Sequence, residues 1–366
     1  MISQKSSSST LEAPAPARLV SDERRRLPPL VRYIALRLGV SVLLIFGVTL
    51  VTFTLTNLVP ADPAQAALGE RAASDPAVVA EFRKAQGLDK PVVVQYFVYL
   101  GHLLQGNLGV STQTHNPVSQ DLAVAFPATA ELAIFVIVFS IFIGIGLGLY
   151  AALRHNRFTD QLIRIFSLGG ISIPTFWLAL AVFYIFFYQL HWAPGSGRLD
   201  PAAQAPPTVT GMYTVDALLA GQWDTFVDAL SHLALPGLVL TLYTVGLLIR
   251  FARSAVLDVL GQDYVTAARA KGLSSRRVVF GYTLRGALLP ILTIVGLAFG
   301  SLLSGTVLTE QVFSWGGIGQ YAYKAATTLD LPAVMGVGLI VGMVYIITNF
   351  VIDVIYGVVD PRVRVQ

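Results

Sequence analysis

The sequence contains no cysteine. This absence excludes disulfide bonds, thiolate metal sites and a cysteine nucleophile. Charged residues are also scarce, since Asp, Glu, Lys and Arg make up 13% of the 366 residues and apolar residues make up 54%. A soluble domain carries roughly 25% charged residues. We therefore expect an integral membrane protein rather than a soluble domain with one core.

The chain also lacks the motifs of nucleotide and metal chemistry. Its five histidines lie far apart in sequence, without a pair at metal-ligand spacing. None of its five lysines follows a glycine, so the phosphate-binding loop G-x-x-x-x-G-K-[ST] is absent. We predict no catalytic residue and no cofactor or metal bound by this chain. If ATP drives the protein, a partner polypeptide must bind the nucleotide and its magnesium.

Six apolar segments are each near the ~20 residues that a helix needs to cross a bilayer. The fold class that this predicts is an all-α integral membrane protein with six transmembrane helices. The expected spans are Leu38–Leu58, Leu132–Leu153, Ile165–Leu190, Leu233–Ile249, Leu288–Leu308 and Val334–Val358.

Basic residues are concentrated before the first span, after the second and after the fourth. Cytoplasmic segments carry such an excess, so we expect both termini in the cytoplasm. The net charge of +4 does not indicate nucleic acid, because the cations cluster at the ends of apolar runs. We divide the chain into a disordered cytoplasmic tail at 1–30 and a transmembrane domain at 31–366. The latter includes an extracytoplasmic loop region at 60–127 and a cytoplasmic segment at 263–285.

The segment 263–290 is the most polar long stretch between two apolar ones. We expect a short helix from Tyr264 to Ala270, ended by Gly272, because glycine adopts the left-handed conformation freely. Ser274 is then expected to cap a second helix through its hydroxyl. On composition alone this is a basic cytoplasmic loop. Its layout of helix, glycine turn and helix suits docking by another protein.

The spacing Thr266-Ala267-Ala268, three residues, then Gly272 resembles the coupling segment of ABC importer permeases. Thr266 stands where the general motif has glutamate, so no role of that carboxylate carries over. The wider sequence DYVTAARAKGLS resembles the dipeptide/oligopeptide permease family. Further similar stretches are VPADPA at 59–64, GLDKP at 87–91, QYFVYL at 95–100, GNLGVS at 106–111, FPATAEL at 126–132, ISIPTFWLAL at 171–180, EQVFSWGGIG at 310–319 and DPRVR at 360–364. Their order resembles the "B" member of the permease pair.

This resemblance implies a permease subunit of an ATP-driven, binding-protein-dependent importer in a prokaryotic cytoplasmic (inner) membrane. The implied partners are a second homologous permease, two ATP-binding cassette subunits, an extracytoplasmic binding protein and the lipid bilayer, with no nucleic acid. The segment from Tyr264 to Arg277 would dock on one ATPase. The residues expected to couple to the ATPase are Asp263, Tyr264, Thr266, Ala267, Ala268, Ala270, Lys271, Gly272, Leu273 and Arg276.

A few residues near the spans are candidates for a gate or a substrate path. Ionisable residues in membrane segments are functional candidates by default, although near the interfaces they also serve as anchors. Prolines inside spans kink helices, which serves packing or a rocking gate. Our candidates are Glu131, Pro174, Glu310 and Phe313.

Two other classes of function stay open at this point. A secondary carrier acting alone is disfavoured, because the spans carry no charge relay and show no inverted repeat. A membrane scaffold or sensor is disfavoured by the absence of a soluble signalling domain. The solute also stays open: dipeptides or oligopeptides come first, and glutathione, nickel chelates or sugars are the alternatives within the same architecture.

Overall fold

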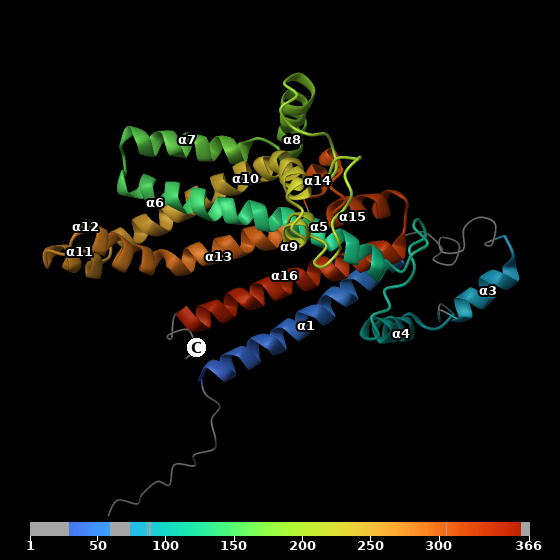
Figure 1. Ribbon diagram of the computed structural model, residues 1–366. Coiled ribbons are helices and arrows are strands. Elements are labelled where there is room, and N and C mark those ends of the chain that lie inside the picture. The colour runs from blue at the N-terminus through green and yellow to red at the C-terminus, as the bar shows by residue number, and fades with distance from the viewer. Residues whose placement is uncertain (1–28, 59–73, 86, 88, 305, 360–366) are drawn as a thin grey trace, which may run out of the picture.

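The computed structural model describes residues 29–58, 74–85, 87, 89–304 and 306–359 (Figure 1). Within these ranges the fold is helical and forms no strand, so the expected all-α class is confirmed. The expected N-terminal tail lies almost wholly outside the described residues, as do the motifs at 59–64 and 360–364. The helices of the first half are α1 (Pro29–Leu58), α3 (Pro76–Ala85), α4 (Val92–Leu104), α5 (Val118–Ser140), π-helix η1 (Ile141–Ile145), α6 (Gly146–Leu153), α7 (Phe158–Ser172), α8 (Thr175–Phe183) and π-helix η2 (Tyr184–Gln189).

The second half begins with a short helix and then forms the longest one. These helices are α9 (Tyr213–Leu219), α10 (Trp223–Leu260), α11 (Asp263–Ala270), α12 (Ser275–Arg277), π-helix η3 (Val278–Thr283), α13 (Leu284–Leu303), α14 (Val307–Phe313), α15 (Ile318–Thr327) and α16 (Leu331–Val359). We name the two ends of the bundle by the short helices found there, the α11 end and the α14 end (Figure 1).

Five helical stretches in the described chain are long and apolar enough to cross a membrane. They are Val31–Thr54, Val118–Leu153, Trp223–Leu260, Ser275–Leu303 and Leu331–Val358. Each contains or overlaps one of the expected spans. The structure describes an integral membrane protein with five such helices, or six if the bent pair α7 and α8 forms one span.

The expected span Ile165–Leu190 corresponds to the bent pair of α7 and α8 with η2, and the kink expected at Pro174 is a sharp break. The chain breaks between α7 and α8, whose axes differ by 94°. Ile173 adopts an extended backbone conformation (φ −83°, ψ 124°), and Pro174 is the N-cap residue of α8. The ring of a proline disfavours helical geometry in the residue before it, and this explains the position of the break. Figure 1 shows α8 crossing the direction of the bundle.

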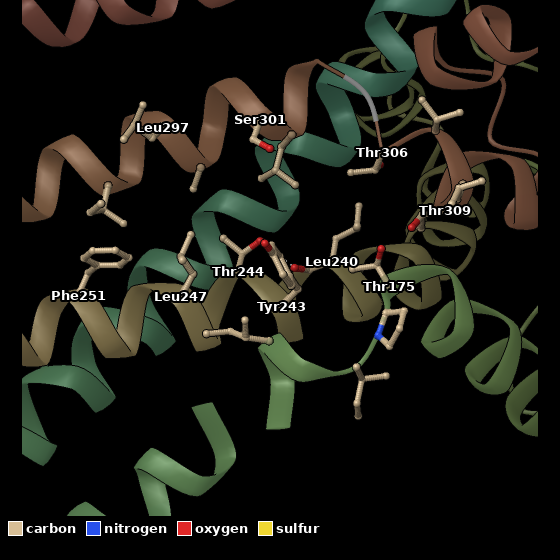
Figure 2. Close-up of a pocket in the computed structure, with 18 residues that line it drawn as sticks. Thr175, Leu240, Tyr243, Thr244, Leu247, Phe251, Leu297, Ser301, Thr306 and Thr309 are labelled. Carbon is tan, nitrogen blue, oxygen red and sulfur yellow. Dashed lines mark hydrogen bonds between the residues drawn. The ribbon is translucent and has the colours of Figure 1, made fainter. Parts of the chain in front are cut away.

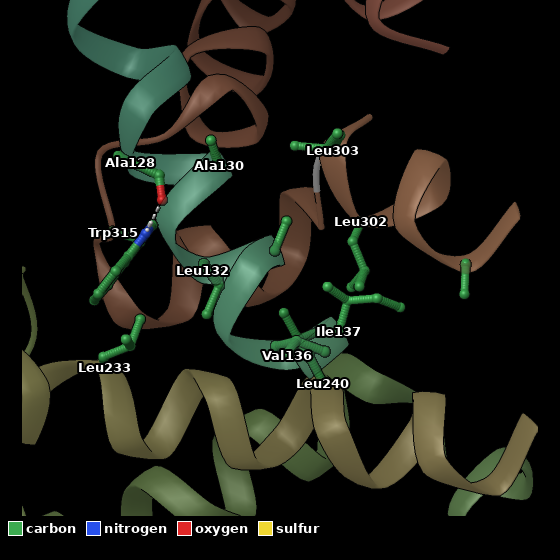
Figure 3. Packing of buried hydrophobic residues seen from close by; sticks show 12 residues of the cluster. Ala128, Ala130, Leu132, Val136, Ile137, Leu233, Leu240, Leu302, Leu303 and Trp315 are labelled. Carbon is green, nitrogen blue, oxygen red and sulfur yellow. Dashed lines mark hydrogen bonds between the residues drawn. The ribbon is translucent and has the colours of Figure 1, made fainter. Parts of the chain in front are cut away.

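Helix α10 is the central element and contacts α5, α6, α7, α8, α9, α13 and α14. Small residues bring its neighbours close. A Cβ on Gly246 would lie 2.7 Å from the carbonyl oxygen of Ser167 on α7, and a Cβ on Gly144 would lie 2.7 Å from Leu248. Such close backbone approach is how helices pack in membranes. The buried cluster of Figure 3 joins α10 to α5 and α13, and includes Leu132, Leu240 and Leu302.

Helix α1 lies beside α16 at the edge of the bundle (Figure 1). Arg37 of α1 pairs with Asp353 of α16 at 3.2 Å. Helix α4 contacts α1 through Tyr96, whose ring lies against Phe46 and Phe53. Only 6% of the α1 span is buried within the chain, so most of this apolar helix is exposed.

Candidate functional site

Helix α11 lies at one end of the bundle, where α10 turns back into α13 (Figure 1). Val265 and Ala268 are buried and pack with Val278, which holds the helix against the bundle. Thr266, Ala267 and Ala270 are exposed. The exposed residues of α11 are thus these three with small side chains together with the larger Asp263, Tyr264 and Arg269.

Gly272 ends α11 in the left-handed conformation, with φ of +74°. Its N–H donates to the Arg269 carbonyl at 2.9 Å, and the N–H of Leu273 donates to the Ala268 carbonyl at 3.4 Å. These bonds satisfy carbonyls that the helix end would leave free. The expected glycine turn is confirmed. A Cβ at Gly272 would meet no atom within 4 Å, so the constraint at this position is backbone conformation alone.

The expected hydroxyl cap at Ser274 is wrong. Ser274 occupies the N-cap position of α12, but its side chain makes no capping hydrogen bond. Its carbonyl accepts the N–H of Val278 at 3.0 Å instead. Helix α12 has only three residues and continues through η3 into α13. The second helix expected after Gly272 is therefore the beginning of the long helical stretch α12–η3–α13.

Tyr264 adds a second contact between α11 and this span. A Cβ added to Gly286 of α13 would overlap the Tyr264 hydroxyl and would lie 3.0 Å from Val259 of α10. Glycine at position 286 therefore allows α11, α10 and α13 to meet. Helix α11 is thus in direct packing contact with two long helices.

A cavity of about 670 Å³ lies between the α7–α8 elbow, α10, α13 and the start of α14 (Figure 2). Ligand sites commonly have volumes of about 300–1,000 Å³. The lining includes no Asp, Glu, Lys, Arg or His, and its polar side chains all carry hydroxyls. These side chains are Thr175, Tyr243, Thr244, Ser301, Thr306 and Thr309.

Glu310 lies in a closed network next to this cavity. It is fully buried, and its carboxylate accepts the Thr129 hydroxyl at 2.8 Å and the N–H of Gln320 at 3.0 Å. Burial raises the pKa of the Glu310 carboxyl, and hydrogen bonds from Thr129 and from the backbone of Gln320 and Gly319 oppose that rise. The Thr129 hydroxyl also accepts the N–H of Ile318 at 2.8 Å. The network ties α14, α15 and α5 together.

The turn after Glu310 fits closely around this carboxylate. A Cβ on Gly317 would lie 2.6 Å from the Glu310 Oε2 and would overlap the Thr129 hydroxyl. The indole N–H of Trp315 donates to the Ala128 carbonyl at 2.7 Å, as Figure 3 shows. A turn follows α14, with Ser314 in the left-handed conformation at its start.

Glu131 of α5 is held by a second network. Arg198 donates to the Glu131 carboxylate at 2.7 Å and to the Gly211 carbonyl at 2.9 Å. Its guanidinium lies 3.7 Å from the ring centroid of Tyr213. The other Glu131 oxygen accepts the backbone N–H and the hydroxyl of Thr214 at 2.7 and 2.6 Å. This carboxylate anchors the segment 198–214 to the bundle.

Asp216 organises the same segment locally. Its carboxylate accepts backbone N–H groups from Val209, Thr210 and Gly211 and the hydroxyl of Thr210. Burial favours a higher pKa for Asp216, but the combined hydrogen bonds hold this pKa below its ordinary value. The folded chain therefore stabilises the ionised form of the Asp216 carboxyl.

The four candidates for a gate or path are placed differently by the structure. Pro174 lines the cavity. Phe313 is buried against the ring of Phe183, at 5.5 Å between centroids. Glu131 and Glu310 do not line the cavity and make the two networks above. A gating role for these four residues stays a prediction.

The sequence reasoning missed the cavity hydroxyls and an ion pair between spans. Arg253 of α10 donates two hydrogen bonds to Asp160 of α7, at 2.7 and 2.9 Å, and Asp160 has no exposed surface. A cation and a carboxylate 93 residues apart give no local signal. The hydroxyl residues were visible inside apolar runs, but only the folded chain brings them to one cavity.

The chain is similar to known membrane transport proteins over most of its length. Residues 144–365 match the family described as the inner membrane component of binding-protein-dependent transport systems, and residues 30–133 match its N-terminal companion. The probable D,D-dipeptide transport system permease DdpB of Escherichia coli K12 is 44% identical over 88% of this chain and 94% of its own length. The di/tripeptide transport system permease DppB of Pseudomonas aeruginosa is 44% identical over 91% and 99%.

One solved structure, the MetNI methionine ABC transporter in inward-facing conformations, is similar at 17% identity and a TM-score of 0.45, over 65% of this chain and 96% of that one. The sequence matches, together with the helical bundle, define a membrane subunit of a transport system. The chain belongs to the family of membrane components of binding-protein-dependent transport systems, and its relatives are named as dipeptide permeases.

Proposed function

We propose that this chain is a permease subunit of an ATP-driven importer for short peptides. The observation that carries the proposal is that α11 exposes the small residues Thr266, Ala267 and Ala270 and packs against α10 and α13. The family and the printed names of the relatives support the peptide substrate. In this proposal an ATP-binding subunit docks on α11, and its closure moves the spans as rigid bodies.

The remaining parts of the proposal concern assembly and orientation. The α11 end faces the cytoplasm, as the concentration of basic residues predicts. A second, homologous permease completes the path, and an extracytoplasmic binding protein delivers the solute at the α14 end. Two ATPase subunits bind the nucleotide, and the complex resides in the cytoplasmic (inner) membrane. The 44% identity to relatives named for D,D-dipeptides and for di/tripeptides favours short peptides over glutathione, nickel chelates or sugars.

Uptake of labelled di-, tri- and pentapeptides tests the proposal in cells that lack this chain and in cells where it is restored. We expect loss of uptake for short peptides and recovery on restoration. Unchanged peptide uptake would contradict the peptide substrate and would favour the alternative solutes. Peptide uptake by the purified chain alone, without ATP-binding subunits, would contradict the importer and favour a secondary carrier.

A further inference from the structure

Thr309 is the most deeply buried of the hydroxyl residues that line the cavity. Thr309 is 1% exposed, and its hydroxyl makes no hydrogen bond within the described part of the chain. Figure 2 shows the hydroxyl directed toward the cavity, near Thr175. Thr244 differs, because its hydroxyl donates to the Leu240 carbonyl at 2.8 Å within α10. Burying a hydroxyl without a hydrogen-bond partner costs free energy. The Thr309 hydroxyl can therefore gain a hydrogen bond from a molecule inside the cavity.

The position of Thr309 is fixed by its neighbours. Glu310, the next residue, is bonded to Thr129 of α5 and to the backbone of α15. The carbonyl of Phe313, at the other end of α14, accepts the N–H of Gly197 at 2.8 Å. Both anchors hold the short helix α14 as one wall of the cavity. This gives the buried Glu310 network a positioning role for Thr309.

We propose that this cavity binds the backbone amide groups of a short linear peptide through neutral hydrogen bonds, with Thr309 and Ser301 as the chief partners. The proposal rests on the proposed function and deepens it. A hydroxyl both donates and accepts, so it matches the N–H and C=O groups that all peptides share. Because the lining carries no ionised side chain, a charged side chain of the peptide gains no counter-ion here. This surface therefore recognises peptides without selecting among their side-chain charges.

Weak neutral bonds also suit passage through a transporter. Hydrogen bonds to ionised groups are roughly twice as strong as neutral ones. A fixed charge in the cavity would hold one class of peptide and slow its release. Hydroxyls on three walls, from α8, α13 and α14, bond the solute and release it readily.

The test is peptide transport by the complete reconstituted complex, with tri-alanine, Ala-Glu-Ala and Ala-Lys-Ala as the probes. We expect Thr309→Val to raise the KM about three- to tenfold, the range for one neutral hydrogen bond, by the same factor for all three peptides. Thr309→Ser keeps the hydroxyl and should transport as the wild type does. The matched control is Thr241→Val on α10, because that buried hydroxyl also lacks a partner but does not line the cavity.

Two results would overturn this inference alone, provided that the wild-type complex transports all three peptides. One is a Thr309→Val complex with the same KM values as the wild type. The other is a rise in KM that is confined to peptides of one charge. If the wild-type complex transports no peptide, the proposed function fails and this inference falls with it. The two failures are thus distinguishable.

A labelling experiment provides a second readout that does not depend on transport rates. The natural chain has no cysteine, so Ser301→Cys introduces a single thiol at an exposed position in the cavity. We expect a small cationic methanethiosulfonate to modify this thiol and tri-alanine to slow the reaction several-fold. Leu43→Cys, exposed on the outer face of α1, should show no such protection. Equal rates for Ser301→Cys with and without tri-alanine would contradict a peptide site in the cavity.

Discussion

Replacing Gly272 with valine tests whether the turn after α11 transmits force. The φ of +74° is left-handed, and a residue with a Cβ loses roughly 1–2 kcal/mol in that conformation. No atom lies within 4 Å of the added Cβ, so the substitution strains this turn without disturbing the packing around it. A cost of this size lowers the population of the native turn by a factor of about 5–30.

The assay measures peptide transport and ATP hydrolysis on the same proteoliposomes, after the amount of assembled complex has been checked. We expect Gly272→Val to leave much of the complex assembled and to reduce transport by about tenfold or more. Gly272→Asn should retain most transport, because asparagine tolerates the left-handed conformation. Gly281→Val is the matched control, since Gly281 also has no neighbour within 4 Å and lacks a positive φ. Full transport in Gly272→Val would refute the reasoning.

Three further predictions concern the networks at the α14 end. Arg198→Ala removes the cation that pairs with the buried Glu131 carboxylate, and this should cost about 3–5 kcal/mol of stability. The loss is measured as a lower thermal midpoint of the purified complex. An unchanged midpoint would contradict a structural role for this ion pair. Gly317→Ala overpacks the turn, which should cost about 1–3 kcal/mol of stability and lower the thermal midpoint. Gly146→Ala is the control, because a Cβ there meets no atom within 4 Å, and it should leave the midpoint unchanged. Equal effects of the two substitutions would contradict the close fit of this turn. The lowered pKa of Asp216 contributes stability that is present above its unfolded pKa of about 3.9 and is lost as pH falls through the folded pKa. Asp216→Asn should therefore lower the midpoint at pH 7 and reduce the further loss below pH 4, and an undiminished loss in this variant would contradict the assignment.

Hydropathy located the membrane helices but not their ends or bends. The fourth span was expected at Leu233–Ile249, whereas α10 runs from Trp223 to Leu260. Window hydropathy measures apolar length, and a helix continues into polar residues as long as its backbone bonds and packing allow. The break at Pro174 had a visible signal in the proline itself, but its 94° bend depends on how α8 packs on α10 and α14.

In the candidate site, too, local features could be predicted from the sequence and tertiary contacts could not. The turn at Gly272 follows from local chain chemistry, because only a residue without a Cβ adopts that conformation freely. The partners of Glu131 and Glu310 come from positions 67 and 181 residues away in the sequence, so tertiary structure alone reveals them. The cavity is a tertiary feature of the same kind, because its hydroxyl residues come from positions spread between 175 and 309 in the sequence.

The central claim, that α11 docks on an ATP-hydrolysing partner, is tested most directly by cross-linking. Ala267→Cys places one thiol on the exposed face of α11 in a chain that has no natural cysteine, and a photoreactive probe attached there can capture a neighbour. Val209→Cys, 71% exposed near the opposite end, carries the same probe as a control. We predict that Ala267→Cys captures the ATP-binding subunit, with a yield that changes when ATP is added, and that Val209→Cys does not. Failure of Ala267→Cys to capture that subunit in a complex that hydrolyses ATP would contradict the account.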